Sequence, residues 1–200
     1  MKKRMQLFAI LTMFALSLTI VSGASASIIG IENLGGLRGN TLAVRDNQWV
    51  AKMFTTGSGS GWNLESVLIS AKENWGSNFQ VSLYSNSGGA PGTLLSALTG
   101  TPPLGSFYTI NNYLDQSQTL LSANTSYWIR YSSSDPNAFN LGTYADYAVN
   151  TYTGLSGWSF ASGANISTDS GSNWSPNALS PMLQIELVNG GGGGATVNLF

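Results

Sequence analysis

The chain lacks two residue types entirely, cysteine and histidine, and it is poor in charge. Without cysteine there is no disulfide framework, no thiolate metal site and no thiol nucleophile. Without histidine the commonest general base and metal ligand is missing, so a Ser-His-Asp triad cannot form. Charged residues supply only 8% of the sequence. We therefore expect a protein that is not an enzyme and has no catalytic residues.

The residues that are present can build one β-rich domain. Of the 200 positions, 42% are hydrophobic and 11% aromatic, which suffices for a core and excludes a disordered acidic polymer. No apolar pattern with a period near 3.6 persists for three helical turns. Short apolar runs alternate instead with clusters of Gly, Asn, Ser and Pro. These patterns predict an all-β fold, namely a single antiparallel β-sandwich.

The N-terminus has the features of a secretory signal peptide. A basic start at residues 2–4 precedes an uncharged apolar run at residues 7–21, and Ala24-Ser25-Ala26 fits the small-residue rule for cleavage. We expect cleavage after Ala26, with a retained membrane anchor as the alternative reading of the apolar run. An exported chain, secreted or at the cell surface, is therefore predicted. Export without cysteine is typical of a bacterial protein.

Charge limits the partners of the exported chain. Removal of residues 1–26 takes away three of the eight basic residues, so five basic residues stand against nine acidic ones and the net charge is −4. The five are scattered along the sequence: Arg38, Arg45, Lys52, Lys72 and Arg130. They form no stripe that would neutralise phosphates, which excludes nucleic acid as a partner.

Alternation of apolar and polar residues places several strands and their core faces. The predicted core-facing sets are Phe79, Val81 and Leu83; Tyr127, Ile129 and Tyr131, opposite Trp128 and Arg130; and Leu183, Ile185 and Leu187. In residues 64–71, Val67 and Ile69 are expected on one face and Leu64 on the other.

These strands divide the chain into four segments. Residues 1–26 are the signal peptide, 27–48 an N-terminal lead-in, 49–188 the β-sandwich and 189–200 a Gly-rich tether. The tether contains five consecutive glycines at 190–194, which cannot hold a strand. The residues that follow them are far too few to span a membrane, so no span is expected in the mature chain.

Four segments carry a resemblance to a known family. They are Gln-Trp-Val-Ala-Lys-Met-Phe-Thr-Thr-Gly at 48–57, Val-Ser-Leu-Tyr-Ser at 81–85, Gly-Gly-Ala-Pro-Gly-Thr-Leu-Leu at 88–95 and Leu-Leu-Ser-Ala-Asn-Thr-Ser-Tyr-Trp at 120–128. From about residue 49 to 188 the chain resembles the bacterial choice-of-anchor R domain. The resemblance implies an exported surface domain with a jelly-roll-like sandwich and no enzymatic activity. Such domains precede a C-terminal anchoring signal. No such motif follows the glycine run here, which leaves attachment to the cell open.

One short motif resembles an Asp-box, a hairpin found in sialidases and other β-propellers. Ser167, Asp169, Gly171 and Trp174 match it, and Asn173 stands where threonine is usual. The carboxylate can accept backbone N–H bonds within the turn, glycine permits positive φ, and the indole pins the hairpin to a sheet. We predict a structural hairpin, with a cation or sugar contact as the alternative.

Two loops carry oxygen ligands of the kind that Ca²⁺ prefers. The candidate ligands are Asp135, Asn137, Asp169 and Asn173, and none lies in an EF-hand loop. No cofactor is expected. The hypothesis that follows from these oxygens is that they bind a structural calcium ion.

Six tryptophans leave room for a ligand-stacking role. Trp75 lies in a polar, turn-like segment and Trp62 follows a Gly/Ser loop, which makes them the candidates for exposed stacking rings. The alternative is that all six belong to the core or pin loops. Our leading hypothesis is a non-enzymatic surface or matrix-associated domain. A carbohydrate-binding module, with polysaccharide or cell-envelope and matrix components as partners, is second. A hydrolase with paired carboxylates is third.

Overall fold

The structure, a computed structural model, describes residues 26–36, 38–59, 61–73, 78–137, 139–144 and 152–189. Trp75, the glycine run at 190–194 and all but the last residue of the expected signal peptide lie outside these ranges. The predictions made for them stay predictions. Among the described residues, a search for a helix with the length and hydropathy needed to cross a membrane finds none.

The part of the chain that the structure describes contains strands and no helix, which confirms the predicted all-β class. The strands are β1 (Ile28–Glu32), β2 (Arg38–Val44), β3 (Trp49–Thr55), β4 (Trp62–Glu73), β5 (Phe79–Ser87), β6 (Ala90–Gly100), β7 (Thr109–Leu114), β8 (Leu120–Leu121), β9 (Ser126–Ser133), β10 (Phe139–Tyr144), β11 (Thr153–Gly154), β12 (Ser159–Phe160), β13 (Ala164–Ser167), β14 (Ser175–Asn177) and β15 (Leu183–Asn189).

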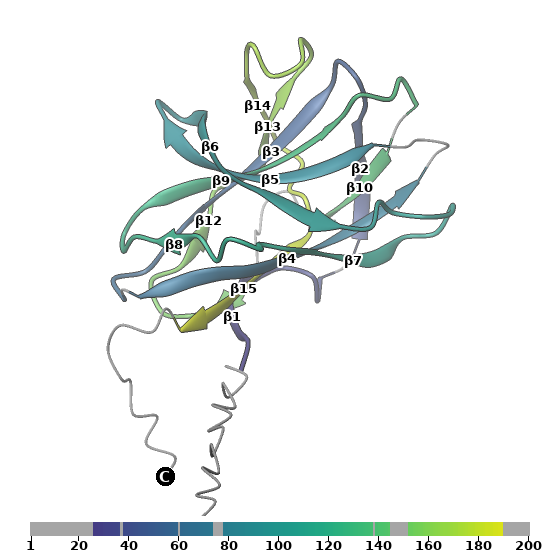
Figure 1. Cartoon of the computed structure of the whole chain (residues 1–200). Coiled ribbons are helices and arrows are strands. Elements are labelled where there is room, and N and C mark those ends of the chain that lie inside the picture. Colours follow the sequence, from purple (N-terminus) through teal and green to yellow (C-terminus); the bar gives the residue numbers. More distant parts are fainter. Residues whose placement is uncertain are drawn as a thin grey trace, which may run out of the picture.

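All these strands pair antiparallel in one large sheet that curls back on itself, consistent with a β-sandwich (Figure 1). We call one part the β4 half; it holds β1, β15, β4 and β7, with β2, β8, β10 and β11 attached. The other part is the β9 half, with β5, β9, β3, β12, β13 and β14. Strand β6 joins them, because it pairs with β5 along most of its length and with β7 at Thr99–Gly100.

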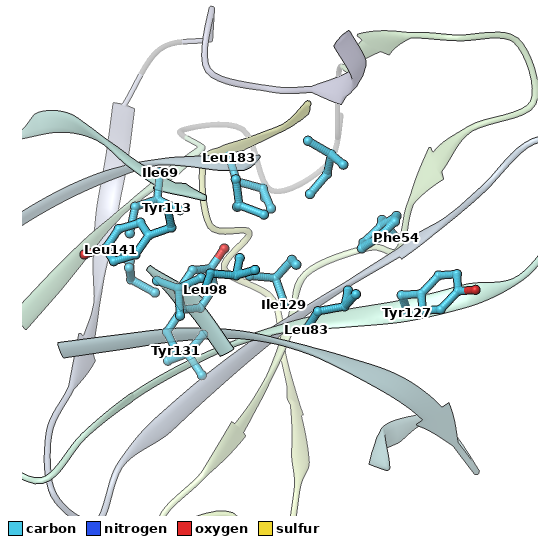
Figure 2. Close-up of a cluster of buried hydrophobic side chains, with 14 of the residues drawn as sticks. Phe54, Ile69, Leu83, Leu98, Tyr113, Tyr127, Ile129, Tyr131, Leu141 and Leu183 are labelled. Carbon is cyan, nitrogen blue, oxygen red and sulfur yellow. The ribbon is translucent and has the colours of Figure 1, made fainter. Parts of the chain in front are cut away.

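The main hydrophobic core fills the space between the two halves. Figure 2 shows side chains converging from both, among them Ile69 and Leu183 from the β4 half and Ile129 from the β9 half. Phe79 ties the halves together, since its ring lies 5.0 Å from that of Phe139 and 6.0 Å from that of Tyr113, centroid to centroid. Burial of each such side chain contributes roughly 1.5–3 kcal/mol, so this packing is the main source of stability.

The core faces predicted for β5, β9 and β15 are confirmed, because all nine predicted side chains lie in the main core. The face predicted for Leu64 is wrong. Leu64 is fully buried in the same core as Val67, although the two are three positions apart and would lie on opposite faces of a regular strand. The ladder with β15 shifts register here: Glu186 pairs with Ser66 and Leu187 with Leu64. One extra residue in β4 makes a β-bulge, which turns Leu64 inward.

The segment predicted as a lead-in contributes two strands to the sheet. Strand β1 pairs with β15, and β2 pairs with β10. Ile31, Leu42 and Val44 are buried in the main core. Residues 28–44 are therefore part of the folded body.

The turn of the β5–β6 hairpin is tight, and pairing of the two strands continues up to it. Ser87 pairs with Ala90, so the turn consists of Gly88 and Gly89 alone. Their φ values of +60° and +83° match a type I′ turn, which requires positive φ at both central residues. Strand β6 was not predicted because its apolar residues do not alternate, and the neighbours Leu94 and Leu95 are both exposed.

Candidate functional site on the outer face of the β9 half

A second hydrophobic cluster lies on the face of the β9 half that points away from the main core. Ala51, Tyr84 and Trp128 are buried there, and Met53 and Trp174 pack against them. Alternation explains the position of the three buried side chains, because each follows a core residue by one step in β3, β5 or β9. An apolar outer cluster on a sheet with so little charge makes this face the candidate site.

Arg130 lies at the centre of this outer face, in contact with two aromatic rings. Its guanidinium carbon lies 4.5 Å from the ring centroid of Trp49 and 4.3 Å from that of Tyr84. The residues directly opposite Arg130 are Ala51 on β3 and Ser82 on β5. Because both are small, the guanidinium has room to reach the rings diagonally across each neighbouring strand. We call Trp49, Arg130 and Tyr84 the Arg130 clamp.

Within the described ranges, no carboxylate balances the charge of Arg130. Its contacts there are with the rings of Trp49 and Tyr84. Its Nε atom is buried and has no hydrogen-bond partner. Burial lowers the pKa of the guanidinium, and Tyr84 opposes that lowering. The clamp thus holds a half-buried cation whose neighbours are neutral.

The Asp-box-like turn is held by its own side chains. The Ser167 hydroxyl donates to Oδ1 of Asp169 at 2.7 Å and accepts from the Gly171 amide at 2.8 Å. The Asn173 amide donates to Oδ1 of Asp169 at 2.8 Å, and Nδ2 of Asn173 donates to Oδ2 at 2.6 Å. The two Asn173 bonds and the Ser167 bond lower the pKa of Asp169 to about 2. Both carboxylate oxygens therefore serve the turn itself.

This turn positions one ring of the clamp. A Cβ added at Gly171 would stand 2.7 Å from Cζ3 of Trp49, so the glycine backbone lies directly against the indole. The φ of Gly171 is +85°, which independently favours glycine. Trp174 closes the turn, because its Nε1 donates to the Gly171 carbonyl at 3.1 Å. The motif residues and the clamp therefore form one connected structure.

The tip of the β5–β6 hairpin is tied to the opposite side of the same half. Nδ2 of Asn165, on β13, donates to the carbonyl of Gly89 at 3.0 Å. Nε1 of Trp128 donates to Oδ1 of Asn86, in the same hairpin, at 2.9 Å. The hairpin therefore reaches across β9 and β3 and fixes the edge of the outer cluster.

The residues predicted as metal ligands come from two loops that meet at the turn between β2 and β3. The Asp46 amide donates to the Asp135 carbonyl at 2.8 Å, and the Ser170 amide donates to the Asn47 carbonyl at 3.2 Å. Oδ1 of Asp135 accepts from the Asn137 amide at 2.8 Å. Within the described ranges no group of three or more Asp, Glu, His or Cys side chains is placed to hold a metal ion.

Two further carboxylates are engaged within their own neighbourhoods. Asp115 accepts from the hydroxyls of Ser96 and Ser117 and from the Thr119 amide. These bonds hold the pKa of Asp115 below its ordinary value, although burial pushes it upward. Glu186 accepts from the Ser66 hydroxyl at 2.5 Å. Both act as hydrogen-bond acceptors for loops and strands.

Of the two predicted stacking rings, one is described. Trp62, at the start of β4, is half-buried and packs against the main core. The rings on the outer face are instead those of Trp49 and Trp174, both half-buried. The sequence feature that indicates this outer face is the alternation in residues 127–131, which places Trp128 and Arg130 opposite the core side of β9. It does not show which rings would meet Arg130.

Lys52 was missed by sequence reasoning and lies on the inner side of β3. Its side chain is fully buried, and Nζ donates to the Ala161 carbonyl at 2.6 Å, the Gly163 carbonyl at 2.8 Å and the Ser180 hydroxyl at 2.7 Å. Burial lowers the pKa of Lys52 to about 7. Lys52 fastens the loops before β13 and β15 to β3 and lies apart from the outer face.

A comparison with models of known protein families finds no match to this chain, and a comparison with curated protein sequences finds none either.

Proposed function

We propose that the chain is a non-enzymatic binding domain of a bacterial exported protein, working at the cell surface or in the extracellular matrix. The resemblance to choice-of-anchor R domains and the expected signal peptide support this proposal. The engaged carboxylates of Asp115, Asp169 and Glu186 support it too, since a glycosidase needs two acids that face each other across a cleft.

The observation that carries the proposal is the built outer face of the β9 half. A turn, a hairpin tip and three strands hold aromatic rings and one arginine there in fixed positions. Outward-facing side chains on a sheet need no such support for stability, because the main core lies on the other face. A rigid aromatic surface with polar groups at its rim is typical of ligand-binding faces.

A specific observation favours carbohydrate as the ligand. Trp49 and Trp174 keep part of their rings exposed, and Asn165 and Asn173 supply amide groups on the same side of the half. Indole faces pack against the C–H faces of pyranose rings, while amides bond to sugar hydroxyls. We therefore propose, as a second and more specific function, that this binding domain is a carbohydrate-binding module.

Two measurements test this function. Cell fractionation of the native host or of an expression strain is expected to find the protein outside the cytoplasm. Pull-down on insoluble and soluble polysaccharides is expected to retain the purified chain, with no release of reducing ends. A cytoplasmic protein, or the steady production of new reducing ends, contradicts the proposal.

A further inference from the structure

We propose that Arg130 recognises an oxyanion on a polysaccharide, either a uronate carboxylate or a sulfate ester, at the Arg130 clamp. This inference rests on the proposed binding function and specifies its ligand. Three properties of the clamp support it. The charge of Arg130 is unbalanced, two rings restrict the approach to its guanidinium, and the net negative charge of the chain does not attract anions in general.

The charge of Arg130 is the first step. Only five basic residues follow residue 26, and this one is half-buried among neutral groups. Burying a cation is unfavourable unless an anion or several acceptors compensate for its lost hydration. In the described structure, the rings of Trp49 and Tyr84 are the groups that compensate for the lost hydration of the guanidinium. Its Nε has no acceptor. An external oxyanion that reaches the terminal Nη groups would balance this charge.

The geometry of the rings is the second step. Trp49 comes from β3 and Tyr84 from β5, on opposite sides of β9. With a ring from each side within 4.5 Å of the guanidinium carbon and with Nε buried, the edge that carries the two Nη groups is what remains for a ligand. That edge is a planar fork, and it matches two oxygens of a carboxylate or sulfate in a bidentate pair.

The surroundings are the third step. The net charge of residues 27–200 is −4, so the chain as a whole repels polyanions. Asp169, Asp135 and Asp46 accept hydrogen bonds from within their own turns. Tight binding of an acidic polymer must then come from a local site. This makes the effect of one arginine measurable.

The experiment compares acidic and neutral polymers with wild-type chain and matched variants. Affinity electrophoresis and calorimetry are run with polygalacturonate, dextran sulfate and uncharged dextran, with sodium acetate and sodium sulfate as free-anion competitors. Arg130→Met removes the charge and keeps most of the volume. Arg130→Lys keeps the charge and removes the fork. Arg38→Met is the matched control, because Arg38 also lies over one ring, that of Tyr108 at 4.4 Å, but on β2 of the β4 half.

We expect the wild type to bind at least one acidic polymer more tightly than dextran. Loss of a charge-assisted bidentate pair should weaken that binding about tenfold or more in Arg130→Met, and by an intermediate factor in Arg130→Lys. Arg38→Met should stay within about twofold of the wild type, because it removes the same charge elsewhere. The acidic polymer that binds identifies the anion as carboxylate or sulfate.

Several outcomes overturn the inference. Equal losses in Arg130→Met and Arg38→Met would show diffuse attraction, and equal binding of dextran and the acidic polymers would show a neutral-sugar site. The latter leaves the proposed function intact, whereas binding to none of the polymers contradicts the carbohydrate form as well. If Arg130→Met does not fold, the Nε–H resonance of Arg130 in wild-type chain is followed by NMR during titration with oligogalacturonate and sulfated dextran oligomers. No movement with either overturns the inference.

Discussion

At the residue scale, two basic side chains are held by different sets of contacts. Lys52 is fully buried, with three oxygen acceptors and the Phe160 ring 5.3 Å from Nζ, while Arg130 is half-buried between two rings. Neither has a carboxylate among its contacts within the described residues. The amino group of Lys52, hydrogen-bonded to carbonyls, joins loops to β3 inside the fold. A planar guanidinium between rings keeps one edge available to a ligand. Two predictions belong to this scale.

The pKa of Lys52 makes stability rise with pH above neutrality. Its pKa is about 7 in the folded chain and 10.5 in the unfolded chain, so between these values the unfolded chain binds a proton that the folded chain does not. The contribution is complete above the unfolded pKa and is lost as pH falls through the folded one. At about 1.4 kcal/mol per pKa unit, the gain between pH 7 and about 9.5 is on the order of 3 kcal/mol.

Urea unfolding at several pH values measures this slope, and Lys52→Met is expected to remove most of it. The pH range of these unfolding measurements ends below the ordinary tyrosine pKa of about 10, so that tyrosine ionisation does not contribute to the slope. Burial raises the pKa of Tyr113 and Tyr131, and their stabilising contribution is lost only at higher pH. A wild-type free energy of unfolding that stays flat across this range would contradict the assignment.

Gly171→Ala tests the contact between the Asp-box-like turn and the clamp. The added methyl would meet both a positive φ and the Trp49 ring, so we expect a loss of roughly 2–4 kcal/mol, from αL strain and overpacking together. Near-UV circular dichroism should change as the indole moves. Gly105→Ala is the control, because Gly105 has a φ of +84° and nothing within 4 Å. Equal losses in the two variants would mean that Trp49 does not rest on the glycine.

At the element scale, one stretch of strands and loops carries most of the exposed apolar surface. Among the residues that the structure describes, nine large hydrophobic side chains are exposed, and seven of them lie between residues 94 and 120, in β6, β7, β8 and their connections. Phe107 and Leu104 are the most exposed, at 83% and 69%. The only charged residue from 86 to 129 is Asp115, which is buried. Two cations from neighbouring strands, Arg38 and Lys72, lie over the ring of Tyr108 in this stretch, while its most exposed apolar side chains favour association.

The double variant Leu104→Ser, Phe107→Ser is therefore expected to reduce self-association without loss of stability. Both side chains are exposed, so the free energy of unfolding should change by no more than about 0.5 kcal/mol. Analytical ultracentrifugation over a concentration series measures the association. Ile29→Ser, an exposed apolar site on β1, is the control and should have a smaller effect. A double variant that associates as strongly as the wild type would contradict this prediction.

At the scale of the whole molecule, the folded body begins earlier than the resemblance suggests. Strands β1 and β2 lie before residue 49, and they complete the β4 half by pairing with β15 and β10. Three of their side chains, Ile31, Leu42 and Val44, fill the main core. Loss of the two strands would open the core to water and leave two long strand edges unpaired.

A chain that starts at residue 49 is accordingly expected not to fold, whereas one that starts at residue 27 should. Loss of three buried aliphatic side chains at roughly 2–5 kcal/mol each rivals the total stability of a domain, about 5–15 kcal/mol. Thermal unfolding followed by circular dichroism compares the two chains. A cooperative transition of unchanged midpoint in the shorter chain would contradict the role of β1 and β2.

Local patterns in the sequence determined the all-β class, the core faces of β5, β9 and β15, and the residue types of the Asp-box-like turn. Alternation and turn chemistry are properties of neighbours in the chain, so they can be read without partners. Only the tertiary structure decided which distant groups meet. Lys52 and Ser180 are 128 positions apart, and the bulge that buries Leu64 depends on the register with β15. The same holds for Arg130, whose two rings come from strands on either side of β9. Contacts of that kind follow from pairing and packing across the fold, for which one sequence carries no local signal.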